Sequence, residues 1–339
     1  LGVDGGTSKT IAFVADDQGR ILGAARGAGS NWSEPDVEVP MEVVVATVRE
    51  ALQRAGLSGD EIAMAAFCLA GADWPEDHER RHAYLAASGI ARRLVVKNDS
   101  FAGLRAGTSR PYGVVIAAGT GVNAAAIAPD GREWAFGYYV DEGGAADMSR
   151  EAIRAVLRQD DGRGPATALT PAVLERLGYA TGEALLRAMV AGELEPARMY
   201  SLCPLVFRAA EAGDEVAARI VVRQGTALAG YATTLIRRFD MSRLEFDVVL
   251  AGSLFKGQGP LLVDTITQAV HRVAPRARIV RARFEPAAGA VLLAYDALGV
   301  AVTEAMYAAL AETSPRAGFF DTADGGQVRP VRRRRGANR

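Results

Sequence analysis

The feature that most limits the fold of this chain is a short pattern that occurs twice. Gly6-Thr7 follows an apolar stretch, and Asp17-Gln18-Gly19-Arg20 comes ten positions later. Gly119-Thr120 also follows an apolar stretch, and Asp130-Gly131-Arg132 again comes ten positions later. Apolar runs separated by glycine-containing turns predict β-hairpins. We therefore expect the same hairpin twice, about 113 residues apart, in the two halves of a duplicated fold.

The length and the pattern of the chain agree with a duplication. At roughly 150 residues per domain, 339 residues predict about two domains, each large enough to bury its own core. Apolar strands, such as the one expected over 94–96, alternate with helical patterns, such as the one over 286–298, which predicts α/β layers. The segment from 171 to 239 is almost entirely helical in pattern, and the pattern weakens beyond about residue 303.

The charge of the chain argues against several partners. Its 39 basic and 40 acidic residues give a formal net charge of -1, so no global field attracts nucleic acid or an anionic membrane. The end of the chain, 325–339, holds six arginines and no acid, which leaves 33 basic and 40 acidic residues in the body. We interpret this end as a disordered terminus, with a weak contact to nucleic acid or an anionic surface as the alternative.

Neither the apolar runs nor the cysteines indicate a membrane or secreted protein. The apolar runs are far shorter than the ~20 residues of a membrane helix. Cys68 and Cys203 lie far apart in the sequence, which favours a reducing environment without structural disulfides. We therefore expect a cytoplasmic protein.

The two repeated turns are suited to binding phosphate. Glycines allow the backbone to come close, so that several N–H groups can converge on an anion. The turn over 4–10 and the turn over 118–121 both have this composition. Neither matches the Walker A pattern or the dinucleotide GxGxxG pattern, and each alone could be an ordinary hairpin turn. Their recurrence after two strands is more informative than either turn.

Two carboxylates follow predicted strands. Asp4 ends the first strand beside its turn and could direct Mg²⁺ through water, because Mg²⁺ takes few carboxylates together with waters and phosphates. The alternative is that Asp4 caps the turn. Asp99 follows the strand over 94–96 and could accept the hydroxyl proton when phosphate is transferred to an alcohol. The alternative is that Asp99 is the N-cap of a helix starting at Ser100.

Five motifs together resemble the N-acetylglucosamine kinase-like proteins of the BadF/BadG/BcrA/BcrD ATPase family, in the acetate and sugar kinase, heat-shock ATPase and actin superfamily. The motifs occur in the family's order over roughly residues 1–300. They are Asp4-Gly-Gly-Thr-Ser-Lys-Thr, Asn98-Asp99, the segment 118–123, Asp141-Glu142-Gly143-Gly144 and Ala251-Gly252-Ser253.

The resemblance implies an α/β fold of two ribonuclease-H-like (actin-like ATPase) domains with a nucleotide cleft between them. The first domain would span 1–110, and the second would span 111–302 with a helical insert at about 145–239. Residues 303–339 would form a tail. The implied protein is a homodimer that uses ATP and Mg²⁺ to phosphorylate the 6-hydroxyl of a small-molecule amino sugar. N-acetylglucosamine is the expected sugar, while glucosamine, glucose, N-acetylmannosamine and N-acetylmuramic acid stay open.

The resemblance also implies roles for single residues. Asp99 resembles the catalytic base, and Asp4 resembles the carboxylate that directs Mg²⁺ through water. The nucleotide would be held by residues of two phosphate loops and an adenosine turn: Gly6, Thr7, Ser8 and Lys9; Gly119, Thr120 and Gly121; Gly252 and Ser253. The sugar would be held by Asn31, Asn98, Asn123 and Asp141. Thr7 replaces a usual glycine, and Val140 and Glu142 depart from the pattern before the double glycine, which affects the identity of the sugar more than the reaction.

Three other functions compete with a kinase. An ATPase activator of the same family would hold a [4Fe-4S] cluster through cysteines near the second loop, but residues 117–121 contain none. His78 and His82 form an HExxH match, yet the segment around them is charged on every side, so we interpret it as a solvated helix face. A sugar-responsive module without catalysis would have little reason to keep Asp99.

Overall fold

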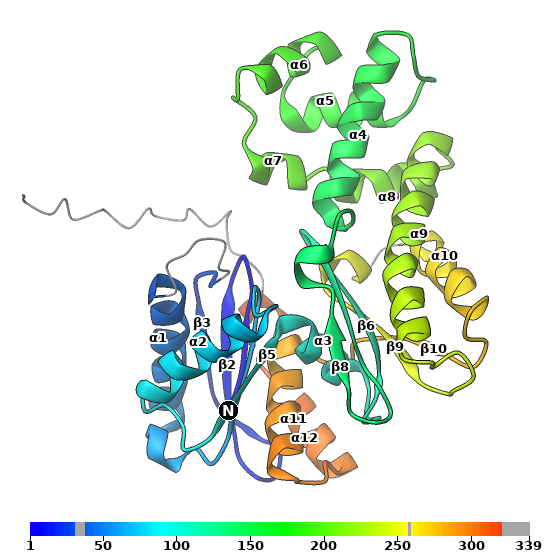
Figure 1. Ribbon diagram of the computed structural model, residues 1–339. Helices are drawn as coiled ribbons and strands as arrows, with labels where there is room; N and C mark the ends of the chain where they lie inside the picture. Colours follow the sequence, from blue (N-terminus) through cyan, green and yellow to red (C-terminus); the bar gives the residue numbers. More distant parts are fainter. Residues whose placement is uncertain (31–37, 257–258, 321–339) are drawn as a thin grey trace, which may run out of the picture.

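The computed structural model describes residues 1–30, 38–256 and 259–320, and it contains two mixed five-stranded sheets flanked by helices (Figure 1). The first sheet has the strand order β3-β2-β1-β4-β5. Its strands are β1 (Gly2–Gly5), β2 (Thr10–Ala15), β3 (Ile21–Gly27), β4 (Ala65–Leu69) and β5 (Leu94–Asn98). The strand expected over 94–96 is therefore present and runs two residues further.

The second sheet repeats the topology of the first. Its order is β10-β9-β6-β7-β8, built from β6 (Gly113–Ala118), β7 (Val122–Ile127), β8 (Glu133–Ala135), β9 (Asp247–Ala251) and β10 (Arg278–Arg281). In both sheets three antiparallel strands joined by hairpins are followed by two parallel strands. The prediction that one hairpin is used twice is confirmed, because β1–β2–β3 and β6–β7–β8 correspond strand by strand.

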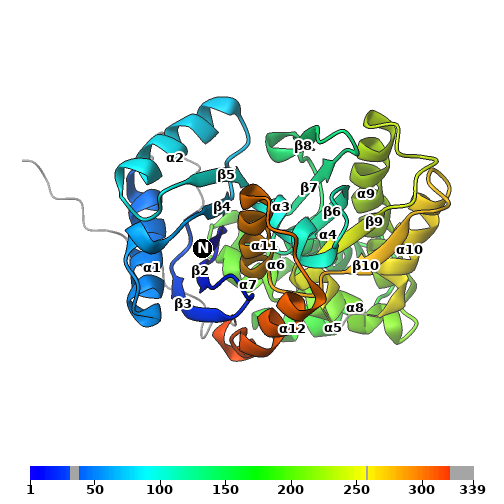
Figure 2. The same ribbon diagram turned by 90° about the horizontal axis from the view of Figure 1, so that it is seen from below.

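Helices from both ends of the sequence cover the first sheet (Figure 2). Helix α1 (Glu38–Ala55) covers one face with an apolar stripe that includes Met41, Val44, Val48 and Leu52, spaced three or four residues apart as an amphipathic helix requires. Helix α2 (Pro75–Ala87) lies beside β5, and the short η1 (Gly59–Glu61) precedes β4.

The opposite face of the first sheet is covered by α3 (Asp99–Gly107) and α11 (Pro286–Leu298). The helix predicted over 286–298 is confirmed, and it is apolar on all sides because it packs between α3 and the sheet. Helix α11 lies so close to β1 that a Cβ on Gly2 would be 2.2 Å from the Val291 nitrogen. A helix from the second half of the sequence thus packs on the first sheet, while the division of the chain near residue 110 stays a prediction.

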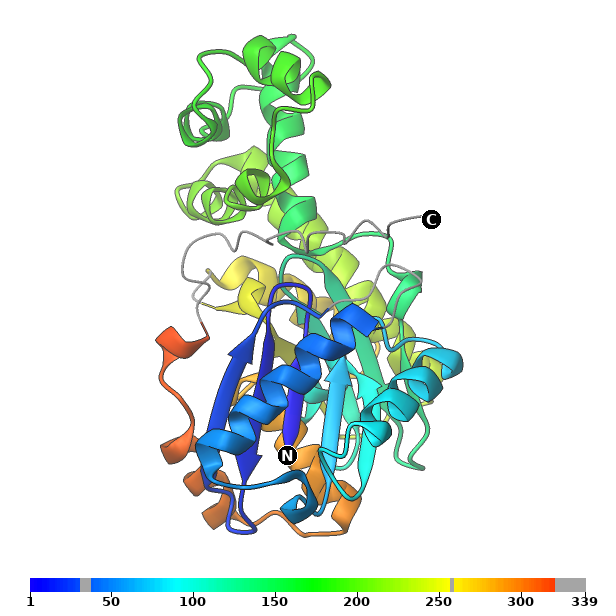
Figure 3. The same cartoon turned by 90° about the vertical axis from the view of Figure 1, so that its left-hand side faces the viewer.

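The second sheet packs against a long helix and carries most of the remaining helices. Figure 3 shows the green helical segment projecting away from both sheets. The helices on the side of the second sheet are α4 (Gly144–Asp160), α5 (Leu169–Leu177), α6 (Gly182–Val190), α7 (Pro196–Tyr200), α8 (Cys203–Glu211), the long α9 (Glu215–Arg238) and α10 (Pro260–His271). One apolar core joins the second sheet to α9 and continues into the projecting helices. The almost entirely helical pattern expected over 171–239 is confirmed.

The expectation of a loose pattern beyond residue 303 is wrong for the residues that follow directly. Helix α12 (Glu304–Thr313) and the 3-10 turn η4 (Ala317–Phe319) pack on the first sheet. The Thr303 side chain accepts a hydrogen bond from the Met306 N–H at 3.2 Å, and Tyr307 and Leu310 join the core around Phe13. The core contacts are long-range, so the local pattern did not reveal them. The arginine-rich end, 325–339, lies outside the described residues.

Within the described residues, no helix is both long enough and apolar enough to cross a membrane.

Candidate functional site

The first predicted phosphate loop is the turn that joins β1 to β2. Within it the Gly6 N–H donates to the Lys9 carbonyl at 2.9 Å, and the Ser30 N–H donates to the Gly6 carbonyl at 3.0 Å. Thr7 and Ser8 are exposed. The turn is therefore tight, tied to the chain that leaves β3, and open to solvent, as a phosphate-binding turn must be.

The second predicted phosphate loop is the equivalent turn between β6 and β7. The Gly119 N–H donates to the Gly121 carbonyl at 2.9 Å, and Thr120 and Gly121 are exposed. The N-terminus of α4 abuts this turn, because the Ala145 and Ala146 N–H groups donate to the Gly119 and Thr120 carbonyls at 2.8 and 3.0 Å. A helix N-terminus carries partial positive charge, so the surroundings of the turn favour an anion.

The predicted adenosine turn lies beside the second loop. Gly252 follows β9 with φ +99°, and a Cβ there would lie 2.3 Å from the Ala118 carbonyl oxygen. Both the left-handed backbone and the close approach require glycine. A Cβ on Gly119 would lie 3.5 Å from the Ser253 hydroxyl oxygen, so Ser253, in η3 (Ser253–Phe255), faces the second loop.

Asp99 is the first residue of α3, and the cap of this helix is its neighbour. The Asn98 side-chain oxygen accepts from the Ser100 N–H at 3.0 Å, which makes Asn98 the N-cap. The alternative that Asp99 caps a helix starting at Ser100 is therefore wrong. Burial and the negative charge of Asp73 raise the pKa of Asp99 to about 6. The N-cap is thus Asn98, and the pKa of Asp99 lies in the range that suits a general base near neutral pH.

Asp4 lies near Asp99, because β1, β4 and β5 are parallel and end at the same edge of the sheet. Burial and the charge of Asp99 raise the pKa of Asp4 to about 7, while Lys9 opposes this shift. The Glu285 carboxylate, at the N-terminus of α11, also acts on Asp4 and forms an ion pair with Lys256 at 2.6 Å. Because Lys256 directly follows η3, Glu285 links the first loop to the adenosine turn.

The surroundings of Asp4 fit a magnesium ion that is held mainly by other ligands. Its partly buried carboxylate lies near two other acids, Asp99 and Glu285, so a cation there would relieve repulsion between them. Across the described part of the chain, no group of three or more His, Cys, Asp or Glu residues is arranged to hold a metal ion. A Mg²⁺ directed by Asp4 would therefore take its other ligands from water and phosphate, as Mg²⁺ ordinarily does.

A hydrogen-bonded chain joins the edges of the two sheets. The Asn98 amide donates to the Asp73 carboxylate at 2.6 Å, and the Asn123 amide donates to the Asn98 oxygen at 3.0 Å. The Gly137 N–H then donates to the Asn123 oxygen at 3.1 Å. The structure thus brings the predicted sugar residues Asn98 and Asn123 together.

Sequence reasoning missed Asp73. The available signal was its position, because Asp73 follows β4 as Asp99 follows β5.

A cavity of about 470 Å³ lined by aromatic side chains lies beside the hydrogen bonds of Asp73 and Asn98. Its size is typical of ligand sites. The Trp74 and Tyr138 rings stack with centroids 5.8 Å apart. Lys97 and Glu133 form an ion pair of 2.7 Å across the gap between the sheet edges. The wall includes Trp74, Trp134, Phe136, Tyr138 and Tyr139 with Asp73, Lys97, Asn98 and Glu133. Local patterns did not predict this aromatic set, because Trp74 begins α2 beside the first sheet whereas the other four residues lie in or directly after β8 of the second sheet.

The other predicted sugar residues lie elsewhere or are not described. Asp141 is exposed, and its carboxylate accepts from the Tyr231 hydroxyl of α9 at 2.9 Å. None of the hydrogen bonds found for Asp141 connects it to Asn98 or Asn123 within the described residues. Asn31 lies outside the described residues, although the preceding Ser30 is buried and accepts from the Thr10 hydroxyl at 2.8 Å.

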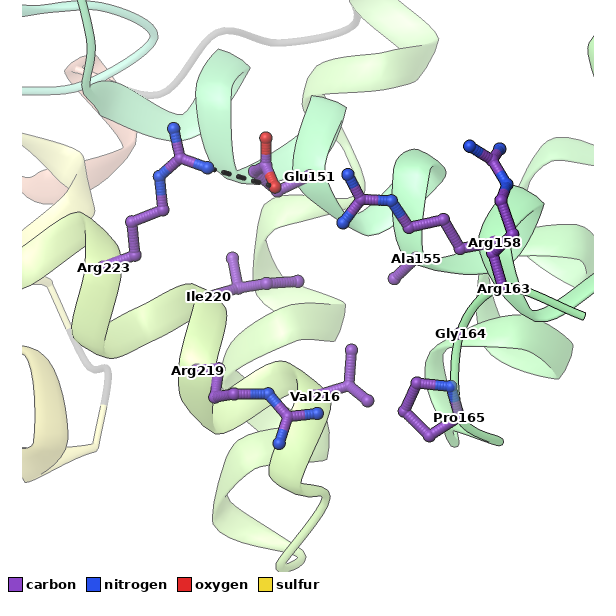
Figure 4. Close-up of a pocket in the computed structure, with 10 residues that line it drawn as sticks. All are labelled: Glu151, Ala155, Arg158, Arg163, Gly164, Pro165, Val216, Arg219, Ile220 and Arg223. Atoms are coloured by element: carbon purple, nitrogen blue, oxygen red, sulfur yellow. Dashed lines mark ion pairs between the residues drawn. The ribbon is translucent and has the colours of Figure 1, made fainter.

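A second cavity, of about 230 Å³, lies between α4 and α9 and contains none of the predicted site residues (Figure 4). Four arginines line it: Arg158, Arg163, Arg219 and Arg223. Three of them form ion pairs with carboxylates. Arg223 pairs with Glu151 at 3.5 Å and with Glu142 at 3.4 Å, while Arg163 and Arg219 pair with Asp161 and Glu215. Since these acids offset much of the positive charge, we do not regard this cavity as the nucleotide site.

The residues behind two competing functions have structural roles. Cys68 and Cys203 are both buried, in β4 and α8, so neither presents a thiolate to a cluster between subunits. The His78 ring nitrogen lies 3.1 Å from the Val96 carbonyl oxygen, and His82 is exposed on α2. These positions give no support to a cluster or a zinc site.

Comparisons with known proteins give matches along most of the chain. The model of the BadF/BadG/BcrA/BcrD ATPase family matches residues 1–294. The N-acetyl-D-glucosamine kinase of Dictyostelium discoideum is 26% identical over 313 residues, which cover 87% of this chain and 97% of that protein. The N-acetylmuramic acid/N-acetylglucosamine kinase of Clostridium acetobutylicum is 25% identical over 298 residues, with the same coverages of 87% and 97%.

A solved structure also matches most of the chain. A candidate N-acetylglucosamine kinase from Chromobacterium violaceum is 26% identical and superposes with a TM-score of 0.66, covering 86% of this chain and 97% of that one. The glucokinase of Streptomyces griseus, solved with glucose and AMPPNP, is 21% identical with a TM-score of 0.53, over 87% and 98% of the two chains. The second likeness supports the fold alone.

Proposed function

The chain belongs to the BadF/BadG/BcrA/BcrD ATPase family, and from this premise we propose that it is an ATP-dependent kinase that phosphorylates the 6-hydroxyl of an amino sugar. N-acetylglucosamine is the proposed substrate, because the Dictyostelium and Clostridium relatives, which this chain covers almost completely, are named for kinases of that sugar. The observation that carries the proposal is Asp99, a carboxylate with a pKa of about 6 next to Asp4 and the first phosphate loop.

Asp99 accepts the proton of the sugar hydroxyl as the oxygen attacks the γ-phosphate. A base with a pKa of about 6 is mostly ionised at neutral pH and still binds a proton well enough to assist the transfer. Asn98 fixes the start of α3 by capping it, which holds the Asp99 backbone in place. The sugar ring is held on the Asn98 and Asn123 side of the site, with Asn31 and Asp141 as further candidates.

The two glycine-containing loops hold the phosphates of ATP through backbone N–H groups of their exposed residues, such as Ser8 and Thr120. The positive end of the α4 dipole lies beside the second loop. Lys9 contributes a positive charge from the first loop, and Gly252 and Ser253 contact the adenosine. Asp4 is the residue that would direct Mg²⁺, which supplies charge neutralisation on the phosphates when bound. We also propose that the two domains close on ATP. A homodimer is a further part of this proposal.

The sugar is identified by ADP release measured with each of five sugars. We expect N-acetylglucosamine to stimulate ADP release most strongly among glucosamine, glucose, N-acetylmannosamine and N-acetylmuramic acid, with the phosphate located on the 6-oxygen by NMR. If none of the five sugars stimulates ADP release, the proposal of a sugar kinase is contradicted, and an ATPase activator or a sugar-responsive module is favoured.

The pH dependence of the reaction is expected to follow Asp99 and to respond to Asp73. Activity should rise with pH through about 6, because Asp99 must lose its proton to act as a base. The charge of Asp73 raises the pKa of Asp99, so Asp73→Asn should lower that pKa and move the rise in kcat/KM for the sugar to lower pH. Asparagine still offers an oxygen to the Asn98 amide. An unchanged pH profile would show that another group controls the rise.

A further inference from the structure

The last described residue contacts a lysine at the opposite end of the sequence. The Lys9 ammonium donates to the Phe320 carbonyl oxygen at 2.7 Å and lies 5.7 Å from the centroid of the Phe320 ring. Lys9 belongs to the first phosphate loop, whereas Phe320 lies beyond residue 294, where the match to the family model ends. The contact therefore joins the candidate nucleotide site to a segment outside the family match.

Several contacts hold the segment 304–320, the C-terminal segment, against the first sheet. The Thr313 hydroxyl accepts from the Ile21 N–H of β3 at 2.8 Å. The Tyr307 hydroxyl accepts from the Arg105 guanidinium of α3 at 2.7 Å. The Phe320 carbonyl thus comes from an anchored segment.

The end of the C-terminal segment is fixed by packing. The rings of Phe319 and Phe320 pack on Phe13 of β2, with centroids 6.4 and 6.1 Å away. The Phe320 residue is only 8% exposed. Its carbonyl oxygen therefore has a defined position beside the first phosphate loop.

Lys9 needs such a fixed partner. A lysine side chain loses rotamer freedom when it is held in one position, and a fixed partner lowers the further loss on binding. The Phe320 carbonyl takes one of the three N–H donors of the ammonium, so two donors are left for an anion. The ring adds a cation–π contact to the same ammonium. These interactions orient Lys9 before any phosphate binds.

We propose that Phe320 is a positioning residue for ATP: its carbonyl and ring hold the Lys9 ammonium at the first phosphate loop, so that the C-terminal segment completes the nucleotide site. The inference rests on the proposed function only in taking ATP as the ligand of this loop.

The test compares two shortened chains. A chain that ends at residue 324 keeps the Phe320 carbonyl inside a peptide bond, with its contact to Lys9, and serves as the control. A chain that ends at residue 316 lacks the Phe320 carbonyl and ring. We expect the Kd for ATP, measured by calorimetry, to rise about 10-fold in the shorter chain, as for the loss of a charge-assisted hydrogen bond. The KM for the sugar should stay within 2-fold or so, since the proposed sugar site is on the Asn98 and Asn123 side.

Lys9→Met distinguishes positioning from general loss of structure. If the C-terminal segment acts through Lys9, ending the chain at residue 316 should have no further effect on the Kd for ATP in the Lys9→Met background. Phe319→Ala is the matched control, because it removes a ring that packs on Phe13 but leaves the Phe320 carbonyl in place. Its Kd for ATP should stay close to that of the parent chain even if its melting temperature falls.

Two results would overturn the proposal: an unchanged Kd for ATP in the chain that ends at 316, or an equal increase with and without Lys9. Because ATP binding is measured directly, these results are separate from a failure of the kinase assay. A chain that binds ATP as expected but phosphorylates no sugar would refute the proposed function and leave the role of Phe320 intact.

Discussion

The variant Asp99→Asn is expected to lower kcat by about 10²–10⁴-fold, which is the usual contribution of general-base catalysis. Asparagine has nearly the same size as aspartate but cannot accept the sugar proton. The N-cap of α3 is Asn98, so the helix should keep its start, and sugar affinity should change only a few-fold. Initial rates under saturating ATP and sugar, with sugar binding followed by calorimetry, measure both quantities.

The control for this variant is a carboxylate far from the reaction. Asp130→Asn alters the second hairpin, where Asp130 pairs with Arg132 at 2.7 Å on the surface, and it should leave kcat unchanged. Near-normal turnover by Asp99→Asn, with intact folding shown by circular dichroism, would remove Asp99 from the role of base and return the assignment to Asp4 or Asp73.

The variant Asp4→Asn should lose activity and gain stability. We expect kcat to fall by about 10²-fold or more, because the carboxylate that directs the metal and its charge neutralisation is gone. The ligand-free protein should become more stable at pH 8 by about 1–3 kcal/mol, since ionising a buried carboxylate beside Asp99 is unfavourable and asparagine avoids that cost.

The size of the stability gain depends on pH. The folded-state pKa of Asp4, about 7, lies above its ordinary value of 3.8, so the folded protein binds more protons than the unfolded chain between these values. The destabilisation of the folded protein by ionised Asp4 is therefore largest above pH 7 and disappears as the pH falls toward 3.8. Urea unfolding at pH 8 and pH 5 should show the gain from Asp4→Asn shrinking to less than half at pH 5. A variant that is less stable than the parent at pH 8 would contradict this account.

Local patterns were enough to predict the parts of the fold that depend on neighbours in sequence. The two hairpins and the helix over 286–298 were predictable because glycine-containing turns and apolar runs report local structure directly. Asp99 was predictable as a residue at a strand end. Its pKa was not, because the shift comes from burial and from Asp73, which is distant in the sequence.

The parts that were missed depend on distant contacts. Trp74 meets Tyr138 only because β5 and β8 are the facing edges of two different sheets. Helix α12 has a weak amphipathic pattern, and it forms because Tyr307 and Leu310 join the core around Phe13. The alternative that Asp99 caps α3 is wrong by one residue, since Asn98 and Asp99 are both good caps and the choice between them depends on the hydrogen bond to Ser100.

The way α11 crosses back to the first sheet has a consequence for the growing polypeptide on the ribosome. Residues 1–107 include every strand of the first sheet together with α1, α2 and α3. The part of one face over β1 and β2, which α11 contacts, still stays largely uncovered until α11 has been synthesised. Domains usually fold in order as they emerge, but here the earliest strands must wait for nearly the whole chain. During that interval Ile11 and Phe13, which α11 and α12 later bury, form an exposed apolar surface that chaperones could bind.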